Sequence, residues 1–390
     1  MSKNKILSKK GKQLLFLFGV LVLGALSVLI VYLLRSKEIE IGAILPLTGD
    51  AAKYGESAKK GINLAIDECN ENFGIKGKNI KIIYEDDQAD PRTGVSAAQK
   101  LIFVDKVQAI IGALPSSVTL AIAPIAEKNR VVILSPASSA PTITHAGDFI
   151  FRNVASDTLE GTAMAEFVCN NLKFKSVAIL YINNDFGFGL RDSFRKRYDA
   201  ACGTVLLAES FEQASTDFRS QLSKIKAQNP EAIYLIGYKE MGRILRQAQE
   251  LGIKCQILSF TMFEDPEILN IAGSIAEGTY YTSRSYDSKA GEGIMGEFNK
   301  DYRLKYNAEP DIFAALSYDA AKIIVKAIGE GGNFGPRIKE ALYTIKNYDG
   351  ATGRISFDEF GDVAGSIGIK RVKQGIFVWY DGKNANLQTD

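Results

Sequence analysis

The sequence predicts an α/β fold with two doubly wound parallel-sheet lobes and a ligand cleft, preceded by an N-terminal transmembrane helix. Three observations predict this: a length of 390 residues, a regular alternation of short apolar runs with amphipathic stretches, and an uncharged run near the N-terminus. At roughly 150 residues per domain, the length suits two domains. Short strands that alternate with helices form βαβ units, in which helices cover both faces of a parallel sheet.

The first element in the chain is the uncharged run from Leu14 to Leu34. A helix of this length crosses a hydrocarbon core of about 30 Å. The lysine-rich residues 1–13 precede it, so the positive-inside rule makes them a cytoplasmic basic segment and places the following chain outside. The run is longer than a signal-peptide core of about 7–15 residues and ends in a poor cleavage site. We expect residues 14–34 to be an uncleaved anchor, with a cleaved secretory signal as the alternative.

The first series of elements runs to about Arg152, with short β-branched strands between helices of 3.6-residue period. The expected strands are Ile39–Leu45, Ile80–Tyr84, Ala109–Gly112 and Val131–Leu134, and the expected helices are Tyr54–Phe73, Thr93–Val104 and Thr119–Lys128. Strands this continuously apolar are typical of sheets buried on both faces.

The second series begins near Asp157 and follows the same alternation. Its expected strands are Ser176–Ile182, Val205–Ala208, Ala232–Gly237 and Gln256–Phe260, with helices near Arg191–Ala201, Phe218–Gln228 and Met241–Leu251. Longer helices and a strand-like tail follow, at Gly293–Tyr306, Ile312–Gly329, Arg337–Ile345 and Gly353–Leu387. Ligands bind outside the carboxyl ends of such sheets, so two successive lobes predict a shared cleft.

Composition narrows the function. Basic residues number 47 and acidic residues 45, and five of the lysines lie in the first dozen residues, so no basic surface indicates a nucleic-acid partner. The single histidine, His145, leaves no basis for a histidine-rich metal site or a His-based catalytic triad. The four cysteines form no C-x-x-C pair, although Cys169 and Cys202 could bridge if their elements meet. We expect no enzyme activity, no cofactor and no metal.

The loops after the first-lobe strands carry the candidate site. Leu114-Pro115-Ser116-Ser117 follows one strand and opens a helix. Hydroxyl groups beside the unpaired N–H groups of a helix start form an anion site that suits a carboxylate. Taken alone, these residues favour plain helix capping as the role of Ser116 and Ser117.

A dozen motifs in the same order resemble the branched-chain amino-acid (Leu/Ile/Val) binding proteins of ABC importers, which are type I periplasmic binding proteins. The motifs are Leu-Pro-Leu-Thr-Gly at 45–49, Tyr54-Gly55, Gly61, Gly74-Ile-Lys-Gly77, Tyr84-Glu-Asp-Asp87, Asp90-Pro91, Ile111-Gly112, Ser135-Pro136-Ala137, Asn183-Asn-Asp-Phe-Gly187, Gly237-Tyr238, Asn270-Ile-Ala-Gly273 with Glu277-Gly278, and Gly353 to Asp362. The resemblance implies three crossovers between the lobes. Lobe 1 then takes residues 39–155 and 284–355, and lobe 2 takes residues 156–283 and 356–390.

The resemblance also implies the polar part of a binding site. Ser116, with Ser117 beside it, and Ser139 match the positions that hold the ligand carboxylate. Ser139 stands where leucine binders often have threonine, so the hydroxyl is kept. The backbone carbonyl of Ala137 matches an acceptor for the ligand ammonium.

The apolar part of the implied site consists of aromatic residues. Tyr54 and Tyr238 match pocket aromatics, and Phe186 stands where an aromatic residue, often tyrosine, lines the cleft from the second lobe. Phenylalanine at this position keeps the apolar wall and loses a hydroxyl group.

One position departs from the family. The amino-acid binders have an acid after the last strand of the second lobe, and Thr261 stands there in this chain. A buried ammonium without a partner costs several kcal/mol, so either another acid replaces it or the ligand is not an α-amino acid. Asp157 matches a second acidic position near the same group. Capping of the following helix is the alternative for Asp157.

The resemblance implies an extracytoplasmic solute-binding protein that captures an amino acid or related small carboxylate for an ABC permease by hinge closure. Its partners are then the small ligand, the permease and the membrane through its N-terminal helix. The alternative is a membrane-tethered ligand-sensing ectodomain that acts through a partner protein, because an anchor also suits a sensor. In both cases we expect the protein at the outer face of the cell membrane.

Overall fold

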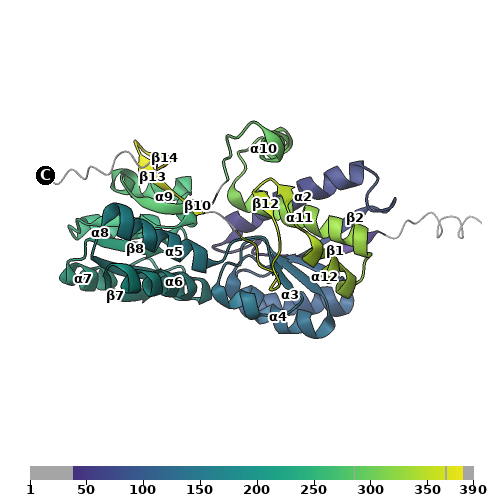
Figure 1. Ribbon diagram of the computed structural model, residues 1–390, viewed down its shortest axis with the longest axis horizontal. Coiled ribbons are helices and arrows are strands. Elements are labelled where there is room, and N and C mark those ends of the chain that lie inside the picture. The colour runs from purple at the N-terminus through teal and green to yellow at the C-terminus, as the bar shows by residue number, and fades with distance from the viewer. Residues whose placement is uncertain (1–37, 285, 365–366, 381–390) are drawn as a thin grey trace, which may run out of the picture.

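The computed structural model describes residues 38–284, 286–364 and 367–380, which form two α/β lobes side by side (Figure 1). The predicted cytoplasmic segment 1–13 and anchor 14–34 lie outside the described residues. Within the described ranges, no helix combines the length and apolar character needed to span a membrane.

The first lobe contains a five-stranded parallel sheet in the order β2-β1-β3-β4-β5. Its strands are β1 (Ile39–Leu45), β2 (Ile80–Asp86), β3 (Ala109–Gly112), β4 (Val132–Ser135) and β5 (Ile150–Arg152). The central strands are buried along their whole length, as their continuous apolar sequences predict.

Helices cover both faces of this sheet. One face packs on α2, α10, α11 and α12, and the other packs on α3 and α4. The bounds are α2 (Ala52–Glu71), α3 (Pro91–Gln99, continued by a π-turn at Lys100–Val104), α4 (Ser116–Asn129), α10 (Gly293–Tyr306), α11 (Ile312–Gly331) and α12 (Gly335–Thr344). A short hairpin adds β11 (Tyr348–Gly350) and β12 (Gly353–Ile355), and a single 3-10 turn spans Pro141–His145.

The second lobe contains a seven-stranded sheet in the order β14-β13-β10-β9-β8-β6-β7. Five strands are parallel: β6 (Ser176–Ile182), β7 (Thr204–Phe211), β8 (Ala232–Ile236), β9 (Gln256–Ser259) and β10 (Tyr280–Arg284). An antiparallel hairpin, β13 (Ile367–Lys373) and β14 (Ile376–Trp379), extends one edge. The strand-like tail predicted from the sequence therefore belongs partly to this sheet.

Helices α5 and α6 pack together on this sheet, and α7, α8 and α9 form a second group. Their bounds are α5 (Asp157–Phe167, continued by a π-turn at Val168–Leu172), α6 (Asp185–Ala201), α7 (Arg219–Gln228), α8 (Glu240–Glu250) and α9 (Pro266–Ala272), with 3-10 turns at Thr261–Phe263 and Gly273–Ala276. A disulfide joins Cys169, after α5, to Cys202, at the end of α6. The two cysteines do meet, as the sequence allowed.

The chain passes between the two sheets three times, after β5, after β10 and between β12 and β13. Phe357 and Val363 pack in the core around the first sheet. The beginning of the segment expected in lobe 2 from residue 356 therefore contacts the first lobe, because these two apolar side chains bury against it.

Candidate ligand-binding cleft

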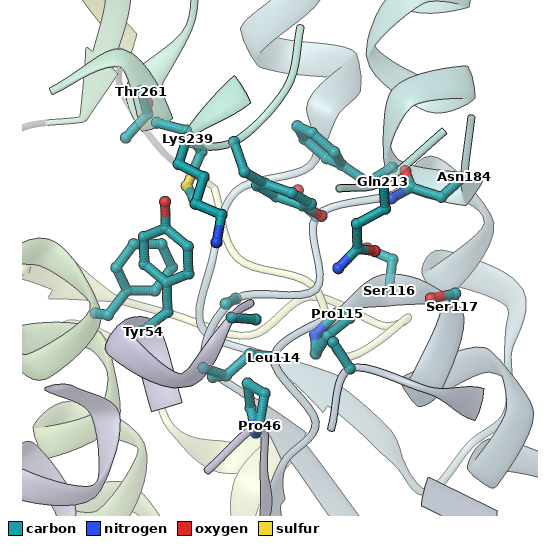
Figure 2. Close-up of a pocket in the computed structure, with 18 of the residues that line it drawn as sticks. Pro46, Tyr54, Leu114, Pro115, Ser116, Ser117, Asn184, Gln213, Lys239 and Thr261 are labelled. Atoms are coloured by element: carbon teal, nitrogen blue, oxygen red, sulfur yellow. The ribbon is translucent and has the colours of Figure 1, made fainter. Parts of the chain in front are cut away.

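A cleft opens between the two lobes, at the carboxyl ends of the parallel strands. The cavity inside this cleft has a volume of about 90 Å³. Eight of the nine predicted residues line it: Tyr54, Ser116, Ser117, Ala137, Ser139, Phe186, Tyr238 and Thr261. In Figure 2 the side chains of Gln213 and Lys239 extend from the second lobe toward first-lobe residues such as Pro46 and Pro115.

Two loops of the first lobe form the polar wall, and buried serine hydroxyls fix them to one another. Ser135 Oγ donates to the carbonyl oxygen of Ala113 at 2.6 Å. Ser138 Oγ lies 3.1 Å from the carbonyl oxygens of Ala113 and Leu114. Ser116 Oγ accepts a hydrogen bond from Ala140 N at 3.2 Å. These bonds hold the loop after β4 against the start of α4.

The hydroxyls of Ser116 and Ser139 are therefore brought to one wall of the cleft. The two residues are only 3% and 5% exposed. Ser116 is also the first residue of α4, whose first-turn N–H groups have no partner within the helix. Two hydroxyls beside these N–H groups can donate hydrogen bonds to an anion.

The fully buried guanidinium group of Arg152 supports this wall from behind. Arg152 Nη1 donates to the carbonyl oxygens of Ser139 at 3.0 Å and Ala140 at 2.9 Å. Arg152 Nε and Nη2 donate to the two carboxylate oxygens of Asp362 at 2.7 and 2.6 Å. The bidentate pair neutralises a buried charge, as a buried arginine requires.

Aromatic rings form the apolar wall. The ring of Tyr54 lies 5.0 Å from Phe313 and 6.3 Å from Tyr238, between centroids. Phe186 stacks on Tyr238 at 5.9 Å and contacts Phe260 at 5.1 Å. Burial raises the pKa of Tyr54 and of Tyr238, so both phenols stay neutral. The wall thus suits an apolar side chain.

A glycine follows the aromatic residue at the first turns of both α2 and α6. A Cβ on Gly55 would lie 2.0 Å from the carbonyl oxygen of Pro46, and a Cβ on Gly187 would lie 1.9 Å from that of Ile182. Only glycine lets each helix begin this close to the preceding strand. The glycine therefore lets each helix begin where the aromatic ring before it faces the cleft. The pairs Tyr54-Gly55 and Phe186-Gly187 are the sequence pattern that marks this arrangement.

Two ion pairs connect the lobes beside the cleft. Lys239 Nζ lies 2.6 Å from Asp50 Oδ1, and Lys53 Nζ lies 2.7 Å from Asp265 Oδ1. In each pair, one partner stands on the first lobe and the other on the second. The two lobes therefore contact each other across the mouth of the cleft.

The position where an acid was expected holds Thr261, which lines the cleft as predicted. Its backbone N and its Oγ1 donate to Glu160 Oε1, at 2.9 and 2.5 Å, and Thr282 Oγ1 donates to the same oxygen at 2.7 Å. Glu160 also lines the cleft and is 1% exposed. The first turn of α5 therefore places an acid at the cleft, and the loop after β9 places a threonine there.

Asp157 is the predicted residue that the structure does not bring to the cleft. Its side chain is fully buried and does not line the cavity. Its backbone N donates to the carbonyl oxygen of Ser139 at 2.8 Å, which fixes the start of α5 against the serine loop. Because α5 begins here, the acid that reaches the cleft is Glu160, three residues further on.

Sequence reasoning missed Glu160, Phe313 and Lys239. Each lies within two turns of a helix start: Glu160 on α5, Phe313 on α11, and Lys239 directly before α8. For Glu160 and Lys239 the usable signal is a helix start after a parallel strand or crossover, where side chains face the cleft, whereas Phe313 follows another helix. Across the described ranges, no group of three or more His, Cys, Asp or Glu residues is placed to hold a metal ion.

Two hinged α/β lobes around a shared cleft define the class of two-lobe solute-binding proteins. The chain belongs to the periplasmic binding protein family, because residues 38–375 match the family model. It is similar to the leucine-, isoleucine-, valine-, threonine- and alanine-binding protein of Pseudomonas aeruginosa, with 29% identity over 91% of this chain and 94% of that protein.

Two solved structures extend the comparison. The leucine-binding protein LivK of Thermotoga maritima has a TM-score of 0.82 and 34% identity, over 88% of this chain and 97% of that one. The branched-chain amino acid transporter substrate-binding protein LivJ of Streptococcus pneumoniae, in complex with isoleucine, has a TM-score of 0.80 and 30% identity, over 87% and 98%. The resemblance stated from the motifs is confirmed, and the chain is a solute-binding protein with a type I periplasmic binding fold.

Proposed function

We propose that this protein captures an α-amino acid with an apolar side chain outside the cell membrane and delivers it to an ABC permease. The observation that carries this proposal is the approach of Ser116 and Ser139 at the start of α4, opposite an aromatic wall. The names of the similar proteins, which bind leucine, isoleucine and valine, support the same class of ligand.

In the proposed complex, the ligand carboxylate accepts hydrogen bonds from the hydroxyls of Ser116 and Ser139 and from N–H groups at Ser116 and Ser117. The carbonyl oxygen of Ala137 accepts from the ammonium group. Each hydrogen bond to a charged group contributes about 1.5–3 kcal/mol.

The ligand side chain lies against Tyr54, Phe186, Tyr238 and Phe313 in this proposal, since these rings line the other side of the cleft. Full burial of a side chain the size of leucine contributes about 1.5–3 kcal/mol. A cavity of about 90 Å³ favours a small ligand over a peptide.

Capture proceeds by hinge closure of two lobes, which we assign to residues 39–155 with 284–355 and to residues 156–283 with 356–390. The ion pairs Asp50–Lys239 and Lys53–Asp265 form when the lobes meet, so they belong to the closed state. The proposed role is binding and transfer, without catalysis.

Residues 14–34 anchor the protein in the membrane in this proposal, with residues 1–13 in the cytoplasm. The uncharged run and the lysines before it support this topology. Fractionation of cells that produce the full chain should recover it with membranes, and deletion of residues 1–37 should release it or keep it from export. Recovery of an intact, soluble full chain would contradict the anchor.

The ligand test uses thermal melts of the full-length chain in detergent with a panel of the common L-amino acids. A ligand at about 100 times its Kd should add about 2.7 kcal/mol of stability. The matched control is the amide of each amino acid, which lacks the carboxylate and should give a smaller shift. Absence of a shift with every amino acid and every small carboxylate would overturn the proposal.

A further inference from the structure

The first lobe has an outer face that lies opposite the cleft. The cleft is at the carboxyl ends of the parallel strands, and β1, with 7 residues, puts about 20 Å between those ends and the amino ends. In Figure 1, β2 and α12 lie on the side of the first lobe that is remote from the second lobe. We define the outer face as the loops that precede β2, β3 and β4, with the loop between α11 and α12: residues 72–79, 103–108, 129–131 and 332–335.

These loops pack side by side around the start of β1. Gly335 N, after α11, donates to Gln108 Oε1 at 3.1 Å. A Cβ on Gly335 would lie 1.8 Å from the carbonyl oxygen of Arg130, so only glycine fits this contact. Ile39 N donates to the carbonyl oxygen of Asn79 at 2.9 Å, which places the start of β1 beside the loop before β2. Since β1 lies between β2 and β3 in the sheet, the loops form one surface around the point where the chain enters the lobe.

Large apolar side chains on the outer face are exposed. Phe73 is 85% exposed and Val104 is 70% exposed. Phe103 and Phe334 are also more than half exposed. They come from three different loops, so they are spread over the face. Apolar side chains gathered on one exposed face mark an interaction site.

Exposed basic side chains lie on the same loops: Lys76 and Lys78 before β2, Lys106 before β3 and Arg130 before β4. The neighbouring acids Glu40 and Asp105 pair with other lysines, Lys81 and Lys100. Two exposed acids, Glu38 and Glu71, lie at the edge of the face, so an excess of positive charge remains. Such a surface fits a partner that is negatively charged outside and apolar beneath, as an anionic lipid bilayer is.

The proposed anchor brings this face to the membrane. The uncharged run ends at Leu34, and residues 35–38 connect it to Ile39 at the start of β1. Even fully extended, this connection reaches about 18 Å at most. The head-group layer outside the hydrocarbon core takes up about 5–8 Å of that length. The start of β1 therefore stays within about 13 Å of the lipid head groups, close to the distance of about 8 Å over which charges attract at physiological salt.

We propose that the outer face of the first lobe binds the surface of an anionic phospholipid bilayer, with its basic side chains against the phosphate groups and its phenylalanines among the head groups. The inference rests on the membrane anchor in the proposed function and does not depend on the ligand. A protein partner is the other occupant that an exposed apolar face can have, and the positive charge and the short connection favour the bilayer. Because the face lies opposite the cleft, this contact leaves the cleft and the second lobe uncovered.

The test uses the full-length chain in vesicles of brominated phosphatidylcholine and phosphatidylglycerol, since bromine on the acyl chains quenches the fluorescence of a nearby indole. Phe73→Trp reports on the outer face. Leu206→Trp is the matched control, because Leu206 is also an exposed apolar side chain and lies on β7 of the second lobe. Wild type, with the single tryptophan Trp379 on β14, gives the background.

Bromination should lower the emission that Phe73→Trp adds to that of wild type by about twofold, as expected for a side chain buried about 5–10 Å into the boundary between head groups and acyl chains. The emission that Leu206→Trp adds should change much less. In phosphatidylcholine alone, or at high salt, the loss from Phe73→Trp should fall toward that of the control, because the attraction is then absent or screened. The further substitutions Lys76→Gln, Lys78→Gln, Lys106→Gln and Arg130→Gln should have the same effect and leave the thermal melt and amino-acid binding unchanged.

The anchor and the outer face can be told apart by these results. If the full chain leaves the vesicles in an alkaline wash, the anchor fails and the inference about the outer face fails with it. If the chain stays in the vesicles and Phe73→Trp is quenched no more than Leu206→Trp, the inference is overturned and the anchor stands. Equal quenching of Phe73→Trp in anionic vesicles and in phosphatidylcholine alone would overturn the role of the basic side chains.

Discussion

The two lobes have the same α/β design and contribute differently to the cleft. The first lobe contributes two backbone loops locked by serine hydroxyls, with Ser135 and Ser138 bonded to the carbonyl oxygens of Ala113 and Leu114. The second lobe contributes side chains on separate elements, such as Phe186, Tyr238 and Glu160, and the first lobe adds only the rings of Tyr54 and Phe313 to the aromatic wall described above. A locked backbone suits the part of a ligand that never varies, and separate side chains can change the specificity by substitution.

Each lobe can be perturbed separately by substitution, so the difference between the two lobes can be tested. Substitution of Asp87, directly after β2, changes the stability of the first lobe. Loss of the disulfide Cys169–Cys202 changes the stability of the second lobe. Ser116 tests the locked wall, and the Lys239–Asp50 pair tests the contact between the lobes.

The largest expected effect concerns Asp87, which is fully buried and whose Oδ2 has no hydrogen-bond partner among the described residues. Burial raises the pKa of Asp87 to about 7. A folded pKa above the unfolded value means that stability is present at low pH and is lost as pH rises from about 4 to about 7. Asp87→Asn should remove this pH dependence, which lowers the free energy of unfolding by on the order of 4 kcal/mol over that pH range.

Urea unfolding of wild type and Asp87→Asn across this pH range measures the difference. Burial also raises the pKa of Asp319, to about 6, so the interval between about pH 6 and 7 isolates Asp87. Asp319→Asn serves as the control, since it should flatten only the lower part of the curve. Parallel curves for wild type and Asp87→Asn would show that Asp87 is charged in the folded state.

The second effect is loss of the disulfide, which closes a loop with a sequence separation of 33 residues. The double variant Cys169→Ser with Cys202→Ser should lose about 3–4 kcal/mol of unfolding free energy, because the unfolded chain regains loop entropy. Urea unfolding of the variant measures it. The free cysteine Cys69 provides the control, as Cys69→Ser should cost much less. Equal losses of unfolding free energy in both variants would show that the disulfide does not stabilise the second lobe more than a free cysteine does.

The third effect separates the two walls of the cleft. Ser116→Ala should weaken every carboxylate ligand by about 1.5–3 kcal/mol, since one hydrogen bond to the carboxylate is lost. Calorimetric titration with several amino acids checks it. Phe186→Leu is the comparison, and it should reorder the ligands because it reshapes the apolar wall. A reordering caused by Ser116→Ala would contradict the division of roles between the two walls.

The smallest effect concerns the contact between the lobes. Lys239→Gln should weaken ligand binding by about 0.2–1 kcal/mol, the range for a partly exposed ion pair. Asp50→Asn should cost the same amount, and the double variant no more than either one. Titrations at low and high salt measure this, since screening weakens the wild-type pair and leaves the variants unaffected. Additive losses would indicate that the two residues act separately.

The fold could be predicted because its signal is local. The strand expected at Ile39–Leu45 has these same bounds, and the helix expected at Tyr54–Phe73 spans Ala52–Glu71. Alternating apolar strands and amphipathic helices are visible in any window of the sequence. The short β5 at Ile150–Arg152 was not expected as a strand, because three residues give too little pattern.

The site could be predicted only where motifs mark it. Ser116 and Ser139 follow strands in recognisable turns, and both line the cleft. Glu160 could not be found in this way, because its partner Thr261 lies 101 residues away in the sequence. The contact between these two residues comes from the packing of α5 against the loop after β9, which no local pattern in the sequence shows.

The bonds of Arg152 have a further consequence for the motion of the lobes. Arg152 is the last residue of β5, after which the chain first leaves the first lobe. Asp362 lies on the third connection, between β12 and β13. Their bidentate bond fixes the first and third connections to one another. The same guanidinium group holds the carbonyl oxygen of Ser139, so the proposed hinge closure should leave the Ser139 loop in the same place relative to both connections.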